Sequence, residues 1–126
     1  RLAAGVQNSE GEMVESFDSP QGVRVISEET SAAMRQILES VVANGGGKNA
    51  QIPGYRVGGK TGTAQTGRYQ EDGEEIMDAW FVGFYPAEEP RYTIAVLLDS
   101  GTHDSDDAAQ VFAKVTDALS FFLAQE

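Results

Sequence analysis

The chain has 126 residues, of which 40% are hydrophobic, and a formal net charge of −11. This length allows one domain or part of one, and the hydrophobic fraction is ordinary for a globular protein. The acidic balance argues against nucleic acid as a partner, because phosphate binding normally needs a basic surface. The sequence shows no signal peptide and no apolar run of the roughly 18 to 20 residues that a membrane helix needs. We therefore expect any membrane anchor to lie outside these residues.

The chain contains no cysteine and a single histidine, His103. Disulfides, thiolate metal sites and a cysteine nucleophile are therefore excluded. A zinc site would depend on His103 and carboxylates, and the acidic clusters at 71–75 and 104–107 lack the ligand spacing of a calcium loop. We predict that His103 and both clusters are solvated, and that the chain uses neither a metal nor a cofactor.

The first half of the chain predicts two short extended segments and one helix. Residues 1–17 read as extended segments around a polar turn at 8–11. A helix is predicted over 27–44, with Ser27 as N-cap and a run of glycines at 45–47 that ends it. Its apolar positions recur at helical spacing, which predicts a core-facing stripe. These positions are Met34, Ile37, Leu38, Val41 and Val42.

The second half predicts three strands and a final helix. A flexible connector at 45–54 leads into a strand over 55–65, followed by a polar loop at 66–76. Strands at 79–85 and 92–98, joined by a short turn, predict an antiparallel hairpin, with Trp80 and Phe81 as core candidates. The last helix is predicted over 106–123 with one apolar face. That face comprises Ala108, Val111, Phe112, Val115, Leu119, Phe122 and Leu123.

The glycine-rich stretch at 54–65 matches two incompatible motifs. Residues 54–61 fit the phosphate-loop pattern G-x-x-x-x-G-K-[ST], and the apolar run that ends at Asp99 imitates a magnesium-binding strand. A phosphate loop, however, needs a buried strand before it and a helix that begins at its lysine. Residues 48–53 are polar and include a proline, and two glycines soon after Lys60 disfavour a helix. Nucleotide binding therefore remains only a remote alternative.

The second motif, Lys-Thr-Gly, fits a strand that lines a catalytic cleft. Alternation places Lys60 and Gly62 on one face, where the ammonium projects into the cleft and glycine leaves room for substrate. The backbone N–H of Thr63 can point at a developing oxyanion, a contact worth about 3–4 kcal/mol in acyl transfer. The hydroxyls of Thr61 and Thr63 can bind a carboxylate, and an edge strand can accept an extended peptide.

Four segments resemble a known family. Residues 55–65 and 79–86 resemble the C-terminal part of the transpeptidase domain of class B penicillin-binding proteins. Residues 25–30 and 47–50 resemble segments that precede the Lys-Thr-Gly strand in that family. The resemblance implies an α/β (α+β) fold of the penicillin-binding protein and serine β-lactamase type. In that fold an antiparallel sheet is covered on one face by the last helix. Residues 1–126 would then be the C-terminal portion of the domain.

The resemblance also implies a peptidoglycan D,D-transpeptidase that acts through an acyl-serine and is acylated by β-lactams. Lys60 would hydrogen-bond the serine of a Ser-x-Asn element, and the Thr63 N–H would share the oxyanion hole. Thr61, Gly62, Thr63 and Gln65 would bind substrate. The chain contains neither Ser-x-x-Lys nor Ser-x-Asn. It therefore lacks the nucleophile, and we predict that it is inactive alone.

The implied partners are D-Ala-D-Ala stem peptides, β-lactams, the upstream part of the same protein and the cell-wall machinery of division or elongation. The implied location is the outer face of the bacterial cytoplasmic membrane. Alternatives of the same fold are a serine β-lactamase, a D,D-carboxypeptidase and a β-lactam sensor domain. A non-catalytic module is the alternative of a different class. Nothing in the pattern favours a triad of His103, Asp99 and a nearby serine.

Overall fold

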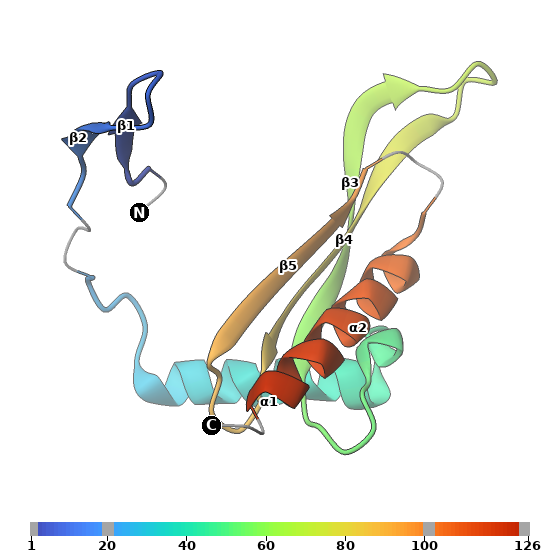
Figure 1. Cartoon of the computed structure of the whole chain (residues 1–126). Helices are drawn as coiled ribbons and strands as arrows, with labels where there is room; N and C mark the ends of the chain where they lie inside the picture. Colours follow the sequence, from blue (N-terminus) through green and yellow to red (C-terminus); the bar gives the residue numbers. More distant parts are fainter. Residues whose placement is uncertain (1–2, 19–21, 100–102, 124–126) are drawn as a thin grey trace.

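The computed structural model describes residues 3–18, 22–99 and 103–123. Its first element is a small antiparallel hairpin of β1 (Gly5–Gln7) and β2 (Met13–Ser16). This confirms the two predicted extended segments, and the side chain of Asn8 holds the turn by accepting the N–H groups of Glu10 and Glu12. Figure 1 shows this hairpin standing apart from the helices and the larger sheet.

Helix α1 (Glu28–Asn44) begins and ends as the sequence predicts. The Ser27 hydroxyl accepts the N–H of Thr30 at 3.1 Å, which satisfies one of the free amides of the first turn. At the other end, the N–H of Gly45 bonds to the carbonyl of Val41. The ends of α1 were therefore predictable from local capping chemistry.

The predicted core stripe of α1 is correct only near the C-terminal end of the helix. Val42 is buried, whereas Met34 is 46% exposed and Ile37 is 56% exposed. Helix α1 packs against β3 and the 3-10 turn η1 (Lys48–Ala50). Within the described part of the chain, the side chains of Met34 and Ile37 are therefore only partly covered.

The segment between α1 and the sheet is ordered, so the prediction of a flexible connector was wrong. Ala50 is fully buried in η1, which packs against the last helix. Gln51 donates its side-chain amide to the carbonyls of Val42 and Ala43, at 2.9 and 3.1 Å. These carbonyls lie in the last turn of α1 and would otherwise lack partners. The connector therefore both caps α1 and joins it to the core.

Three strands form the main sheet, in the order β3-β4-β5 with antiparallel neighbours. They are β3 (Gly58–Tyr69), β4 (Glu75–Tyr85) and β5 (Tyr92–Leu98). The three predicted strands and the antiparallel β4–β5 hairpin are confirmed. The polar loop predicted at 66–76 is wrong, because β3 and β4 run through most of it. Side chains of Thr66 and Glu75 bond to backbone groups there and hold this extension together.

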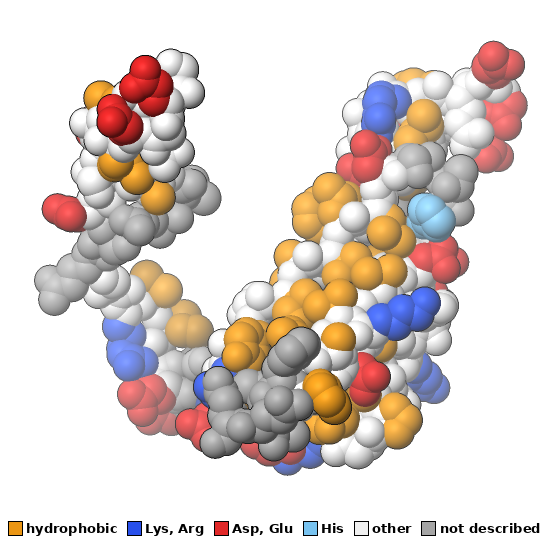
Figure 2. Space-filling model, viewed as in Figure 1, with side chains coloured by type: hydrophobic (Ala, Val, Ile, Leu, Met, Phe, Trp, Pro, Cys, Tyr) orange, Lys and Arg blue, Asp and Glu red, His pale blue; other side chains and the backbone are white. Residues whose placement is uncertain are grey.

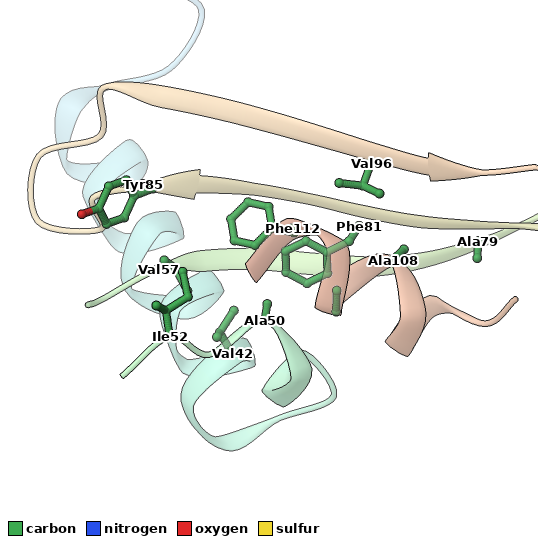
Figure 3. Close-up of a cluster of buried hydrophobic side chains, with 11 residues drawn as sticks. Val42, Ala50, Ile52, Val57, Ala79, Phe81, Tyr85, Val96, Ala108 and Phe112 are labelled. Atoms are coloured by element: carbon green, nitrogen blue, oxygen red, sulfur yellow. The ribbon is translucent and has the colours of Figure 1, made fainter. Parts of the chain in front are cut away.

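Helix α2 (Ser105–Leu123) covers one face of the sheet, as predicted. The rings of Phe112 and Phe81 face each other with centroids 4.7 Å apart (Figure 3). The buried face of α2 differs from the predicted one, since Val115 is exposed while Thr116 and Ser120 are buried. Four of the buried positions form a row at a spacing of four residues, and Ala109 is buried beside it; the row is Ala108, Phe112, Thr116 and Ser120. The side chains of residues 122 and 123 lie outside the described part.

The other face of the sheet is mostly open. Direct cross-strand partners share a face, and the pairs Lys60–Val82 and Trp80–Leu97 lie opposite the α2 side. Val82 is 42% exposed and Leu97 is 45% exposed. Within the described residues, neither α1 nor α2 has the length and apolar character required to cross a bilayer.

Candidate active site

The Lys-Thr-Gly-Thr run lies in the first half of β3, an edge strand of the sheet. Lys60 and Gly62 pair with Val82 and Trp80 on the open face, as the alternation predicts. The other three predicted site residues pair with positions on the α2 side: Thr61 with Phe81, Thr63 with Ala79 and Gln65 with Met77. All five therefore lie along one strand, but they divide between its two faces.

The Lys60 side chain turns back to the edge of its own strand. Its Nζ donates to the carbonyl of Thr61 at 2.9 Å and to the Thr61 hydroxyl at 3.2 Å. This differs from the prediction of an ammonium that projects freely from the strand. The contact uses two of the three Nζ–H groups. Although Lys60 and Thr61 point to opposite faces, their polar atoms thus meet at the open edge of the sheet.

Gly62 differs from Gly58, Gly59 and Gly83, the other glycines in the regular part of the sheet, in what a side chain would contact. A Cβ at Gly59 would lie 2.6 Å from the Phe81 ring, and one at Gly83 would lie 2.7 Å from the Phe112 ring. A Cβ at Gly62 would meet only the Cβ of Trp80, at 3.4 Å, an ordinary contact distance. Packing therefore requires glycine at 59 and 83 but not at 62. What glycine provides at 62 is clearance above the strand.

Arg56 fixes the start of β3. Its guanidinium bonds both carboxylate oxygens of Glu39 in α1 and lies 3.2 Å from the carboxylate of Glu88 in the β4–β5 turn. The hydrogen bond from Arg56 lowers the pKa of Glu39. The backbone of Ala87 also bonds to the carbonyl of Arg56, at 2.9 Å. One exposed arginine thus joins α1, the β4–β5 turn and the chain that enters the Lys-Thr-Gly strand.

Arg68 ties the far end of β3 to the two other strands. Its Nη2 bonds to the carboxylate of Asp99, just beyond β5, and lies 3.6 Å from that of Asp78 in β4. The hydrogen bond from Arg68 lowers the pKa of Asp99. In the sequence Asp99 stands where a magnesium ligand would be, but in the structure its carboxylate bonds to the guanidinium of Arg68. No sequence pattern indicates this ion pair, since Arg68 and Asp99 are 31 positions apart.

The two requirements of a phosphate loop are absent from this part of the chain. Lys60 lies within a strand, and the residues that follow it continue that strand to Tyr69. No helix N-terminus is therefore present at the lysine to face a phosphate. The structure thus removes the local basis for the nucleotide-binding alternative.

The acidic clusters and His103 have structural roles at the described positions. The Asp104 carboxylate accepts the N–H groups of Asp106 and Asp107 and so caps α2. His103 lies 3.3 Å from the carboxylate of Asp107, and both side chains are exposed. The cluster at 71–75 forms the tip of the β3–β4 hairpin, where Figure 2 shows acidic side chains gathered.

Comparison with known proteins gives a consistent result. Residues 6–117 match the penicillin-binding protein transpeptidase domain. The chain is 51% identical over 80 residues to stage V sporulation protein D of Bacillus subtilis, a match that covers 61% of this chain and 12% of that protein. It is 35% identical over 119 residues to penicillin-binding protein PbpB of Mycolicibacterium smegmatis, covering 81% of this chain and 18% of the relative.

A solved structure shares the fold. It is the D,D-transpeptidase domain of a peptidoglycan glycosyltransferase from Eggerthella lenta, with a TM-score of 0.64 and 33% sequence identity. The similarity covers 94% of this chain and 26% of that one. The chain thus spans less than a fifth of the two curated relatives and about a quarter of the solved chain.

Proposed function

This chain belongs to the penicillin-binding protein transpeptidase family, and on that premise we propose that it supplies one wall of a peptidoglycan D,D-transpeptidase site. The complete enzyme would transfer an acyl group from a D-Ala-D-Ala stem peptide to a neighbouring stem, through a serine ester. β-Lactams would acylate the same serine. No Ser-x-x-Lys occurs among the 126 residues, so the remaining part of the domain would supply the nucleophile.

The clearance above Gly62 is the observation that carries this proposal. The chain's own packing does not require a glycine at this position, since the nearest atom to an added Cβ is 3.4 Å away. Its neighbours Lys60 and Thr61 place an ammonium and a hydroxyl 3.2 Å apart at an open strand edge. A donor pair beside an uncrowded edge strand suits a ligand that has a carboxylate and an extended backbone.

Each residue then takes a defined role. Thr61 and Thr63 hold the terminal carboxylate through their hydroxyls, and Gly62 allows the substrate backbone to approach. The backbone N–H of Thr63 donates to the oxyanion of the tetrahedral intermediate. Lys60 releases Thr61 and donates to the serine of the Ser-x-Asn element, where it assists proton transfer. No metal or cofactor takes part.

The open face of the sheet supports a position for the missing nucleophile. Lys60 shares that face with Val82, and Leu97 lies one strand further along the same face. Both hydrophobic side chains are nearly half exposed. A partner surface that covers them would bring its own groups next to Lys60. We therefore place the remaining part of the domain against this face, with the nucleophilic serine near Lys60.

Labelling with a fluorescent penicillin tests the proposal. We expect no covalent label on this chain alone, and a labelled serine outside residues 1–126 in the longer protein. Gly62→Ala in the longer protein should slow labelling at least tenfold, because the added methyl enters the space above the strand. A stable adduct on any serine within residues 1–126 would overturn the proposal.

Two further measurements separate the alternatives. A serine β-lactamase would release the hydrolysed penicillin within seconds, whereas a transpeptidase should retain the acyl-enzyme far longer. Magnesium-ATP should leave the melting temperature of the chain unchanged, since Lys60 is followed by a strand and not by a helix that could bind phosphate. We also propose that the enzyme works at the outer face of the bacterial cytoplasmic membrane with the cell-wall machinery, and that other segments anchor it.

A further inference from the structure

The far end of the Lys-Thr-Gly strand contains a bulge. Pairing with β4 is regular from Gly58 to Gln65, which pairs with Met77, and resumes only where Tyr69 pairs with Glu75. Strand β3 thus advances four residues while β4 advances two. Gly67 lies within the bulge at a φ of 69°, a value that favours glycine. The regular part of the strand ends at Gln65.

The carboxylate of Glu75 joins the two sides of this bulge. Its Oε2 accepts the side-chain Nε2–H of Gln65 at 2.8 Å, and its Oε1 accepts the backbone N–H of Gly67 at 3.0 Å. Glu75 is partly buried, while Gln65 is exposed. One carboxylate therefore holds both the backbone of the bulge and the last side chain of the regular strand.

This contact fixes which way the Gln65 amide faces. An ionised carboxylate has acceptors only, so the atom of Gln65 that meets it must be the NH₂ group. The amide oxygen of Gln65 is then directed away from Glu75. In the absence of Glu75 the amide would be free to turn over and present either group.

Gln65 also lies in register with the residues proposed to hold the substrate. Thr61, Thr63 and Gln65 alternate along one face of β3, so Gln65 is about 7 Å beyond Thr63. Toward the other end of the strand, Val57, Gly58 and Gly59 are buried, whereas residues 63–65 are exposed. A peptide whose carboxylate lies at Thr61 and Thr63 therefore has open strand edge only toward Gln65.

We infer that Glu75 is a positioning residue that orients Gln65 so that its amide oxygen accepts an N–H of the stem peptide. The donor would be the N–H of the residue that precedes D-Ala-D-Ala. This inference rests on the proposed function, because it takes the terminal carboxylate to lie at Thr61 and Thr63. It makes the site selective for a hydrogen-bond donor at that position of the substrate.

The orientation of Gln65 is testable in this chain without any substrate. In a ¹⁵N NMR spectrum the side-chain NH₂ of Gln65 should exchange slowly and show two well-separated proton shifts. Glu75→Ala should bring both features to the values of a free glutamine, while the rest of the spectrum reports an intact fold. Glu74→Ala is the matched control, since it removes a neighbouring carboxylate that has no described contact with Gln65. An unchanged Gln65 signal in Glu75→Ala would overturn the inference.

The substrate contact is testable in the longer protein. A stem peptide that ends in D-Ala-D-Ala is compared with an analogue in which an ester oxygen replaces the N–H of the preceding residue. We expect the natural protein to show a KM about fivefold lower for the amide, the effect of one neutral hydrogen bond. In Glu75→Ala the ratio of the two KM values should fall to about one.

A charge swap separates positioning from stability. Gln65→Glu alone places two carboxylates together and should abolish the preference for the amide. The double variant Gln65→Glu/Glu75→Gln restores both hydrogen bonds, because the new amide at position 75 can donate to position 65 and accept from Gly67. It also keeps an oxygen directed outward, so the preference should return. A double variant that does not regain it would contradict the inference.

The inference and the proposed function fail in different ways. If the longer protein shows no penicillin labelling and no turnover of stem peptides, the proposed function is wrong, and the NMR result still decides the orientation of Gln65. If labelling is normal but the KM ratio of the natural protein is one, the contact between Gln65 and substrate is wrong.

Discussion

The two faces of the main sheet differ in how far their side chains are buried and in how much room they leave around glycine. On the α2 side, Phe81 and Phe112 are fully buried, and a side chain at Gly83 would clash with the Phe112 ring. On the other side, Val82 and Leu97 are nearly half exposed, and Gly62 has room for a methyl group. The first face is explained by the fold of this chain. The second carries features that the chain itself does not use, and such features indicate a surface that meets something else.

The largest expected effect lies on the covered face. Phe112→Ala should lower the free energy of unfolding by about 3–5 kcal/mol, since it removes a fully buried ring and leaves a cavity. Chemical denaturation of the chain measures this. Val115→Ala, one turn further along the exposed side of α2, is the control and should cost less than about 1 kcal/mol. Equal losses would mean that the two sides of α2 do not differ as described.

A smaller loss is expected from a glycine on the same face. Gly83→Ala should cost about 1–3 kcal/mol, because its Cβ would lie 2.7 Å from both the Phe112 ring and the carbonyl oxygen of Gly58. The comparison is with Gly62→Ala in this chain, which should change stability by less than about 0.5 kcal/mol. Thermal melts of the two variants are sufficient. A Gly62→Ala chain as unstable as Gly83→Ala would remove the main support for the proposed site.

The covered face also contains one polar atom whose removal should stabilise the protein. The Thr116 hydroxyl is buried and makes no hydrogen bond among the described residues. Thr116→Val keeps the shape and removes the cost of burying that group, so we expect a gain of about 1 kcal/mol. The melting temperature should rise by several degrees. A lower melting temperature would show that the hydroxyl has a hydrogen-bond partner. In that case Thr116→Ser, which keeps the hydroxyl, should lower the melting temperature less than Thr116→Val does.

The smallest effect in this chain is expected on the open face. Leu97→Thr should change the stability of the chain by less than about 0.5 kcal/mol, because Leu97 is nearly half exposed and threonine suits a strand. In the longer protein the same change should cost more than about 1 kcal/mol, if the face is covered there. Denaturation of both forms gives the comparison. Equal, small effects would contradict the proposed position of the remaining part of the domain.

Local chemistry made much of this fold predictable. Ser27 and the glycines at 45–47 specify the ends of α1, and the short turn between β4 and β5 allows only an antiparallel pair. The wrong predictions concern positions whose environment is set by packing and side-chain contacts. Thr66 and Glu75 hold β3 and β4 together through a polar stretch. Thr116 is buried because it lies in line with Phe112.

The candidate site was predictable to a similar extent. The Lys-Thr-Gly motif located the strand, and alternation placed Lys60 and Gly62 on one face. Alternation did not reveal that Lys60 bonds to Thr61, because that contact depends on the path of a flexible side chain across the strand edge. Nor did it single out Glu75, whose carboxylate bonds to the side-chain amide of Gln65 across the two strands. Side-chain partners require the folded geometry.

The bulge in β3 also isolates the register of the Lys-Thr-Gly motif from changes in the length of the hairpin tip. Residues 66–68 absorb the mismatch between the strands, so the pairing of Lys60 with Val82 is independent of how the chain turns at 70–74. Insertions or deletions in the hairpin tip need not shift the Lys-Thr-Gly strand by one residue, a shift that would reverse every side chain on it. We therefore expect a change in the length of the tip to leave the pairing of the motif with β4 intact.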